Sequence, residues 1–127
     1  MYEMTSRDFK NIEKFNGKLN SRYEYLEAIA EALGIDTVGV RHGARVMKGI
    51  ALDEHTELDC KCRTTKGKMF IKEIFVTHQE YGKVNGETKM VDYRSDWFQF
   101  KRNKWYKNVM GEWNESTHGF NYTQVEM

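Results

Sequence analysis

The sequence predicts an α+β fold in which an N-terminal helical hairpin packs on an antiparallel β-meander of about five strands. Two observations support this prediction. Apolar residues recur at helical spacing up to residue 34, whereas beyond it they mainly alternate with polar residues. Turn signals built on Gly, Asn and Lys separate these later segments. We therefore expect a single domain over 1–127, with a helical hairpin over 1–34, an antiparallel sheet over 35–110 and an irregular tail over 111–127.

Two amphipathic segments are expected to form the helical hairpin. In the first, Ser6 is the expected N-cap and Gly17 follows the helix end. In the second, Ser21 and Glu24 form a capping box, and Gly34 is the expected C-terminal stop. The apolar stripes that face the sheet are Phe9, Ile12 and Phe15 in the first helix and Leu26, Ile29, Ala30 and Leu33 in the second.

The strand region begins with an ambiguous segment. Residues 44–52 suit either a helix or a strand, because their apolar residues have helical spacing whereas Gly49 favours a strand or bend. Residues 56–64 alternate cleanly, which is typical of a half-buried strand. After a turn at 65–68, residues 69–78 carry apolar side chains on both faces, which predicts the central strand.

Two tight turns are expected in the second half of the chain. Asn85-Gly86 is the strongest hairpin signal, because both residues tolerate the positive φ of a type I′ turn, and it joins 81–84 to 89–94. A second tight turn at Arg102-Asn103 joins 97–102 to 104–109.

Composition indicates the broad class of protein. A net charge of +1 argues against a protein that coats nucleic acid, and 13% aromatic residues argue against disorder. The first residues lack the apolar region of a secretory signal, and no run of apolar residues approaches the roughly 20 that a membrane span needs. Cys60 and Cys62 are too close for an unstrained disulfide. We expect a cytoplasmic protein with reduced thiols and no membrane partner.

The segment 94–107 is the first candidate binding site. It holds five basic residues and one acidic residue, 5 − 1 = +4, in a chain whose total charge is +1. Alternation predicts that Phe98, Phe100 and Tyr106 enter the core, and that Trp97 and Trp105 lie on the other face. The expected binding residues are Arg94, Trp97, Gln99, Lys101, Arg102, Lys104, Trp105 and Lys107.

Two functions from different classes fit this composition. Trp, Tyr and Arg dominate protein–protein hot spots, which favours a small, non-catalytic intracellular binding protein with Trp97 or Trp105 as its anchor. In general character the chain resembles small accessory or inhibitory proteins with which phages occupy a host protein. The alternative is a site for single-stranded nucleic acid or a nucleotide, in which the rings stack on bases. The plainest alternative is that these aromatic residues are core residues flanked by solubilising lysines.

Residues 41–45, Arg-His-Gly-Ala-Arg, are the second candidate site. They resemble the RHGxR signature of the histidine phosphatase superfamily. The resemblance implies a largely parallel α/β fold in which His42 accepts a phosphoryl group and Arg41 and Arg45 bind phosphate. His118 is then the only late candidate for the second His of that family. The simpler interpretation is a basic loop that binds an anion.

His55, Cys60, Cys62 and His78 carry side chains of the kind that ligate metal ions. Same-face neighbours in a strand are about 7 Å apart, which is too far for two Zn–S bonds, and the spacing matches no zinc module. We therefore expect no metal and no cofactor. The absence of proline leaves the sheet edges unprotected. A sheet edge is therefore also a candidate surface for pairing with a partner or with another copy of the chain in a homo-oligomer.

Overall fold

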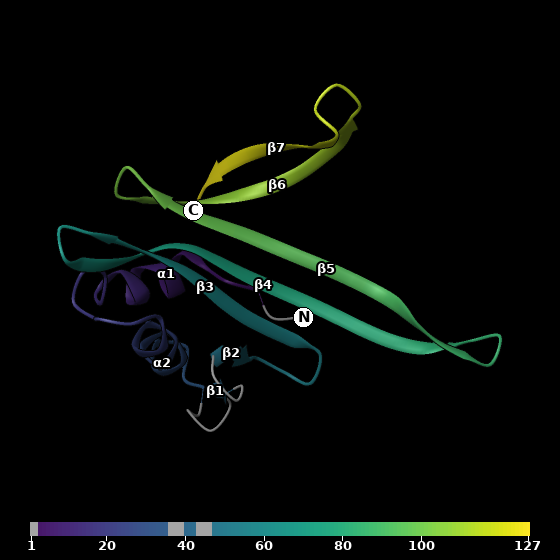
Figure 1. Cartoon of the computed structure of the whole chain (residues 1–127), viewed down its shortest axis with the longest axis horizontal. Helices are drawn as coiled ribbons and strands as arrows, with labels where there is room; N and C mark the ends of the chain where they lie inside the picture. Colours follow the sequence, from purple (N-terminus) through teal and green to yellow (C-terminus); the bar gives the residue numbers. More distant parts are fainter. Residues whose placement is uncertain (1–2, 36–39, 43–46) are drawn as a thin grey trace.

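The computed structural model describes residues 3–35, 40–42 and 47–127, with the backbone alone at 40–42, 47 and 48. Helices precede strands along the chain, as expected for the α+β class (Figure 1). The elements are α1 (Ser6–Glu13), α2 (Arg22–Ala32), β1 (Val40–His42), β2 (Met47–Ala51), β3 (Thr56–Thr65), β4 (Lys68–Val84), β5 (Glu87–Lys101), β6 (Lys104–Asn114) and β7 (Gly119–Glu126).

The strands form one antiparallel meander. Among the described residues there are seven strands, ordered β1 to β7, and each pairs with the next along the chain. β4 is the central strand, as predicted. The sheet is larger than the expected five strands, because residues 47–51 form strand β2 and residues 119–126 form strand β7. Neither α1 nor α2, the helices of the described chain, has the length and apolar character to cross a lipid bilayer.

Local capping explains where the helices begin and end. Thr5, not Ser6, caps α1: its hydroxyl accepts from the Asp8 N–H at 3.4 Å, and the Asp8 carboxylate accepts from the Thr5 N–H at 2.9 Å. An acid three residues later completes this capping box, and Ser6 lacks one. α2 ends at Ala32 with Leu33 as its C-cap, and the predicted stop Gly34 follows with φ +72°, while the Ile35 N–H donates to Ala30 O at 2.8 Å.

β4 and β5 are much longer than the short segments predicted from alternation. β4 runs for 17 residues and β5 for 15, and they pair up to the Asn85-Gly86 turn, whose φ angles are +52° and +81°. The predicted type of turn is therefore confirmed. The predicted breaks between strands are wrong, because backbone pairing continues through polar stretches where the apolar pattern lapses. Val91 has no partner in the β4–β5 ladder and forms a bulge. At this bulge the alternation of side chains between the two faces of β5 shifts by one residue.

The irregular tail predicted over 111–127 is also wrong. β6 continues to Asn114, a turn follows in which His118 has φ +50°, and β7 returns alongside β6. A register shift between Met110 and Trp113 interrupts the alternation of side chains between the two faces, so alternation along the sequence does not predict this pairing. Figure 1 shows the β6–β7 hairpin diverging from β5, while the β4–β5 hairpin extends well beyond both helices.

The core lies between the helices and one face of the sheet, which we call the helical face; the opposite face is the open face. A bulge in β4 at Lys72 lets both Ile71 and Ile74 point to the helical face. This explains why the apolar residues of 69–78 do not follow a strict two-residue alternation. The buried cluster comprises Met4, Phe9, Ile12, Tyr25, Leu26, Ile29, Ala30, Ile50, Leu58, Cys60, Ile71, Ile74, Val76, Phe98 and Trp105.

Candidate functional site

Trp105 belongs to the core, so its predicted role as an exposed anchor is wrong. It is 3% exposed, and its ring centroid lies 4.7 Å from that of Phe9 and 5.2 Å from that of Phe100. The reason is the register: the two-residue turn pairs Phe100 directly with Trp105, and directly paired residues share a face. Trp97, whose neighbours Phe98 and Asp96 face the helices, lies on the open face as predicted.

The basic residues of the segment 94–107 do not form one surface. The Lys104 ammonium lies 3.0 Å from the Glu126 carboxylate, which raises the pKa of Lys104. The Lys107 ammonium lies 3.8 Å from Asp96, and the Lys101 ammonium lies 5.9 Å from the centre of the Tyr106 ring. Arg102 occupies the turn, and Arg94 is exposed opposite His78. The predicted positive surface is therefore divided between the two faces.

Gln99 is partly buried on the open face, and its side-chain amide makes hydrogen bonds to the neighbouring strands. Its side-chain amide donates to Glu73 Oε1 at 3.1 Å, and its Oε1 accepts from Asn108 Nδ2 at 3.0 Å and from Gln124 Nε2 at 2.8 Å. Gln124 also donates to Asn108 Oδ1 at 2.9 Å. These side-chain hydrogen bonds form a polar ladder that crosses the four strands from β4 to β7.

Gln99→Ala is expected to lower the free energy of unfolding by about 1–3 kcal/mol, because it leaves the Nδ2 group of the buried Asn108 without its hydrogen bond to Gln99. Urea denaturation followed by circular dichroism measures the loss. Ser95→Ala, an exposed change on the same face of β5, is the control and should leave stability within about 0.5 kcal/mol. Equal stability of both variants would contradict a structural role for the ladder.

An aromatic row crosses the open face next to this ladder. Phe75 and Trp97 lie parallel with ring centroids 6.4 Å apart, and Tyr122 meets Trp97 edge-on at 5.3 Å. The Lys61 ammonium lies 5.5 Å from the centre of the Phe75 ring at one end of the row. Rings from β4, β5 and β7 thus lie together, although only Trp97 belongs to the predicted site.

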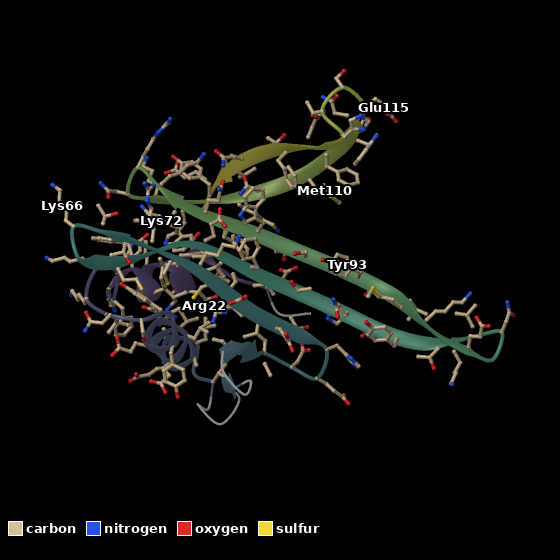
Figure 2. The ribbon with its side chains drawn as sticks, in the orientation of Figure 1. Arg22, Lys66, Lys72, Tyr93, Met110 and Glu115 are labelled. Atoms are coloured by element: carbon tan, nitrogen blue, oxygen red, sulfur yellow. The ribbon has the colours of Figure 1, made fainter. Side chains whose placement is uncertain are left out.

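A hollow of about 550 Å³ lies beside the aromatic row, between β5 and the β6–β7 hairpin. Figure 2 places Tyr93 on β5 and Met110 on β6, at the two sides of this hollow, and each is more than half exposed. We call it the β5–β7 hollow. It is lined by Phe75, Tyr93, Arg94, Ser95, Asp96, Trp97, Lys107, Asn108, Val109, Met110, Phe120 and Tyr122.

Two strand edges border the hollow. β5 pairs with β6 only from Trp97 to Lys101, so within the described chain β5 has no strand on this side over residues 87–96. β6 likewise pairs only with β7 over residues 109–114. Backbone groups of both edges are therefore left for another extended chain.

The second predicted site lies mostly outside the described residues. Arg41 and His42 contribute backbone to β1, and the structure describes neither their side chains nor Arg45. The described sheet is antiparallel throughout, whereas the resemblance to histidine phosphatases implies a largely parallel one. His118 lies in the turn before β7.

The metal-type residues separate into two groups. The rings of His55 and His78 lie 6.2 Å apart at the start of β3, four residues before Cys60 along the strand. A hydrogen bond between the thiols raises the pKa of Cys60, together with burial, and lowers the pKa of Cys62. Cys60 is buried and Cys62 is half-buried, consistent with apolar packing against the helices.

Sequence reasoning missed the contribution of the last strand to this surface. Phe120 and Tyr122 alternate with Asn121 and Thr123, which is the signal of a strand with one distinct face. Phe120 packs edge-on against Trp113 with ring centroids 5.1 Å apart, and both are about half exposed. Comparison with known proteins found no matching family model, no similar curated protein and no similar solved structure.

Proposed function

We propose that this protein binds an extended segment of a protein partner in the β5–β7 hollow. The observation that carries the proposal is the position of an apolar hollow between two open strand edges. An added strand gains backbone hydrogen bonds from an edge and specificity from pockets for alternate side chains. The protein would act by occupying this segment, as an accessory or inhibitory protein does.

The distribution of exposed apolar side chains supports a binding role. Of the twelve large hydrophobic residues that are exposed among the described residues, only Tyr23 lies outside β4–β7. Five of them line the β5–β7 hollow, and such a cluster of exposed apolar side chains is typical of interaction sites: Tyr93, Val109, Met110, Phe120 and Tyr122. The residues in β4–β7 are Tyr81, Val84, Met90, Val91, Tyr93, Val109, Met110, Trp113, Phe120, Tyr122 and Val125.

The charge around the hollow favours a protein over nucleic acid. Its lining contains Arg94, Lys107 and Asp96, and Asp96 lies close to Lys107. Binding of a phosphate backbone requires several uncompensated cations along one path. The Trp97 ring is also already covered by Phe75 and Tyr122, which limits its use as a platform for a base.

The test is selection of short peptides on the full chain from a displayed random library, followed by titration of the selected peptides. Met110→Asp places a charge in the hollow and is expected to weaken binding at least tenfold. Val84→Asp, at the tip of the β4–β5 hairpin, is the matched control and should not change affinity. N-methylation of alternate peptide backbone nitrogens should also abolish binding, because it removes the donors of an added strand.

Three results would overturn this proposal. The first is that no peptide is selected, or that selected peptides bind Met110→Asp as well as the unmodified chain. The second is tighter binding of a single-stranded oligonucleotide, with affinity that falls steeply as salt rises. The third is self-association that Met110→Asp disperses, which would assign the hollow to a second copy of this chain.

A further inference from the structure

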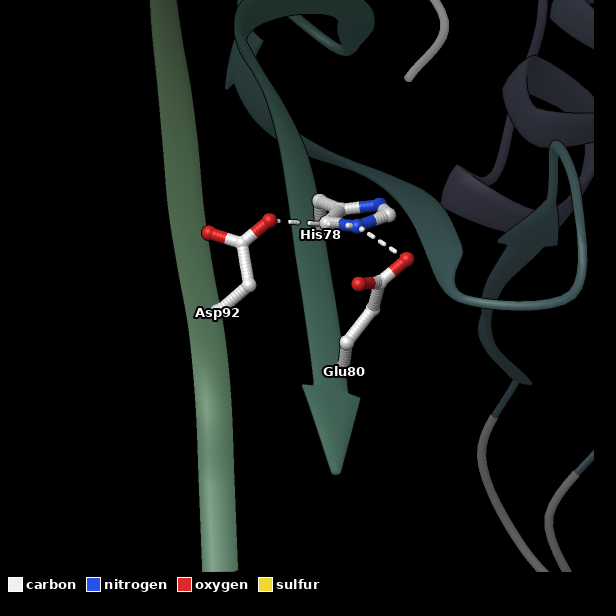
Figure 3. Close-up of side chains that lie close together, drawn as sticks. All are labelled: His78, Glu80 and Asp92. Carbon is white, nitrogen blue, oxygen red and sulfur yellow. Dashed lines mark ion pairs between the residues drawn. The ribbon is translucent and has the colours of Figure 1, made fainter. Parts of the chain in front are cut away.

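His78, Glu80 and Asp92 meet where the helical face emerges from under the helices (Figure 3). His78 and Glu80 are two residues apart in β4, so their side chains share a face. Asp92 lies opposite Glu80 in β5. His78 is 7% exposed, while both carboxylates reach solvent.

A backbone bulge brings Asp92 into this cluster. Next to the Asn85-Gly86 turn, Val84 pairs with Glu87, and this register would place Val91 opposite Glu80. Because Val91 is left unpaired in a bulge, Asp92 takes that position and turns to the face of His78. The bulge thus adds a second carboxylate beside the ring.

The three side chains converge on a small volume. His78 Nε2 lies 3.2 Å from Glu80 Oε1 and 3.7 Å from Asp92 Oδ2. One ligating atom from each residue lies within 4.8 Å of the other two. A tetrahedral ion with bonds of about 2.0–2.2 Å holds its ligands roughly 3.3–3.6 Å apart, so the observed spacing requires only small side-chain movements.

The other ring nitrogen of His78 contacts a buried hydroxyl. His78 Nδ1 lies 2.7 Å from the hydroxyl of Thr56, which is fully buried. The His55 N–H and the Thr56 hydroxyl bond the Asp53 carboxylate and lower the pKa of Asp53. When Nδ1 carries the ring proton and donates it to the Thr56 hydroxyl, the Nε2 lone pair on the side of Glu80 and Asp92 is available to a metal ion. A cation bound between Nε2 and the two carboxylates would offset the repulsion between Glu80 and Asp92.

We propose that His78, Glu80 and Asp92 bind a divalent transition-metal ion such as Zn²⁺. One imidazole nitrogen and two carboxylate oxygens suit such an ion, and Thr56 is the outer partner that orients a metal-binding histidine. The exposed side of the cluster leaves a coordination position for water. The bound ion ties β4 to β5 at the base of the projecting hairpin. All three ligands belong to this chain, so binding of this ion does not require the proposed partner.

The test is calorimetric titration of the full chain with Zn²⁺ alone, together with the thermal midpoint of unfolding and ¹⁵N chemical shifts of the histidine rings. The expected result is one bound ion, a midpoint that rises with Zn²⁺ concentration, and a shift of His78 Nε2. Glu80→Gln and Asp92→Asn preserve side-chain shape and should weaken Zn²⁺ binding at least tenfold. Glu87→Gln, an exposed change at the hairpin tip, is the matched control and should bind Zn²⁺ as tightly as the unmodified chain.

Each of the following results would overturn the site. Unchanged Zn²⁺ affinity in Asp92→Asn would show that the cluster is not the ligand set. Loss of Zn²⁺ binding in Cys62→Ser alone would assign the ion to the thiols. Mg²⁺ binding of equal strength would indicate a general attraction of cations to carboxylates. A proton that remains on His78 Nε2 throughout the titration would assign the cluster to an imidazolium held between two carboxylates.

Discussion

Trp105→Ala is expected to lower the free energy of unfolding by about 3–5 kcal/mol, the usual cost of truncating a buried Trp. The ring fills the space between Phe9 of α1 and Phe100 of β5, so its removal leaves a cavity under the first helix. The loss should appear in urea denaturation as a lower midpoint with an unchanged slope.

Trp113→Ala is the matched control for this prediction. Trp113 is 48% exposed on the same strand, and its removal should change stability by no more than about 1 kcal/mol. If both substitutions had the same small effect, Trp105 would be a surface residue and the register between β5 and β6 described here would be wrong.

Gly49→Ala is expected to cost about 3 kcal/mol, from a backbone conformation that side chains rarely adopt and from a steric clash. Gly49 has φ +147°, and a Cβ atom there would lie 2.6 Å from the carbonyl oxygen of Leu58. Relief of that contact requires β2 to move away from β3. Thermal or urea unfolding measures the effect, and hydrogen exchange should report faster opening at Ile50, which pairs with Leu58.

Gly119→Ala separates this clash from a general effect of replacing glycine. Nothing lies closer than 4.0 Å to a Cβ atom at Gly119, and its φ is not positive, so stability should change by less than about 0.5 kcal/mol. A neutral Gly49→Ala variant would contradict the close approach of β2 to β3.

The candidate site was only partly predictable from the sequence. Trp97 was placed correctly on the open face because alternation holds over the five residues that precede the Arg102-Asn103 turn. Trp105 was misplaced because the face of a residue beyond a turn depends on the register of pairing, which the turn geometry sets. Tyr122 was missed because a bulge near Gly111 separates β7 from the regular pattern of the preceding strands.

The sequence by itself determined the features that depend on neighbouring residues. The α+β class, the termination of α2 before Gly34 and the turns at Asn85-Gly86 and Arg102-Asn103 follow from periodicity, capping and tolerance of positive φ. Only the tertiary structure decided which residues share a face over long distances. Bulges at Lys72, Val91 and near Gly111 each reverse the alternation, because one unpaired residue moves all later side chains to the other face. The aromatic row, the β5–β7 hollow and the cluster of His78, Glu80 and Asp92 arise from these register shifts and from strand pairing.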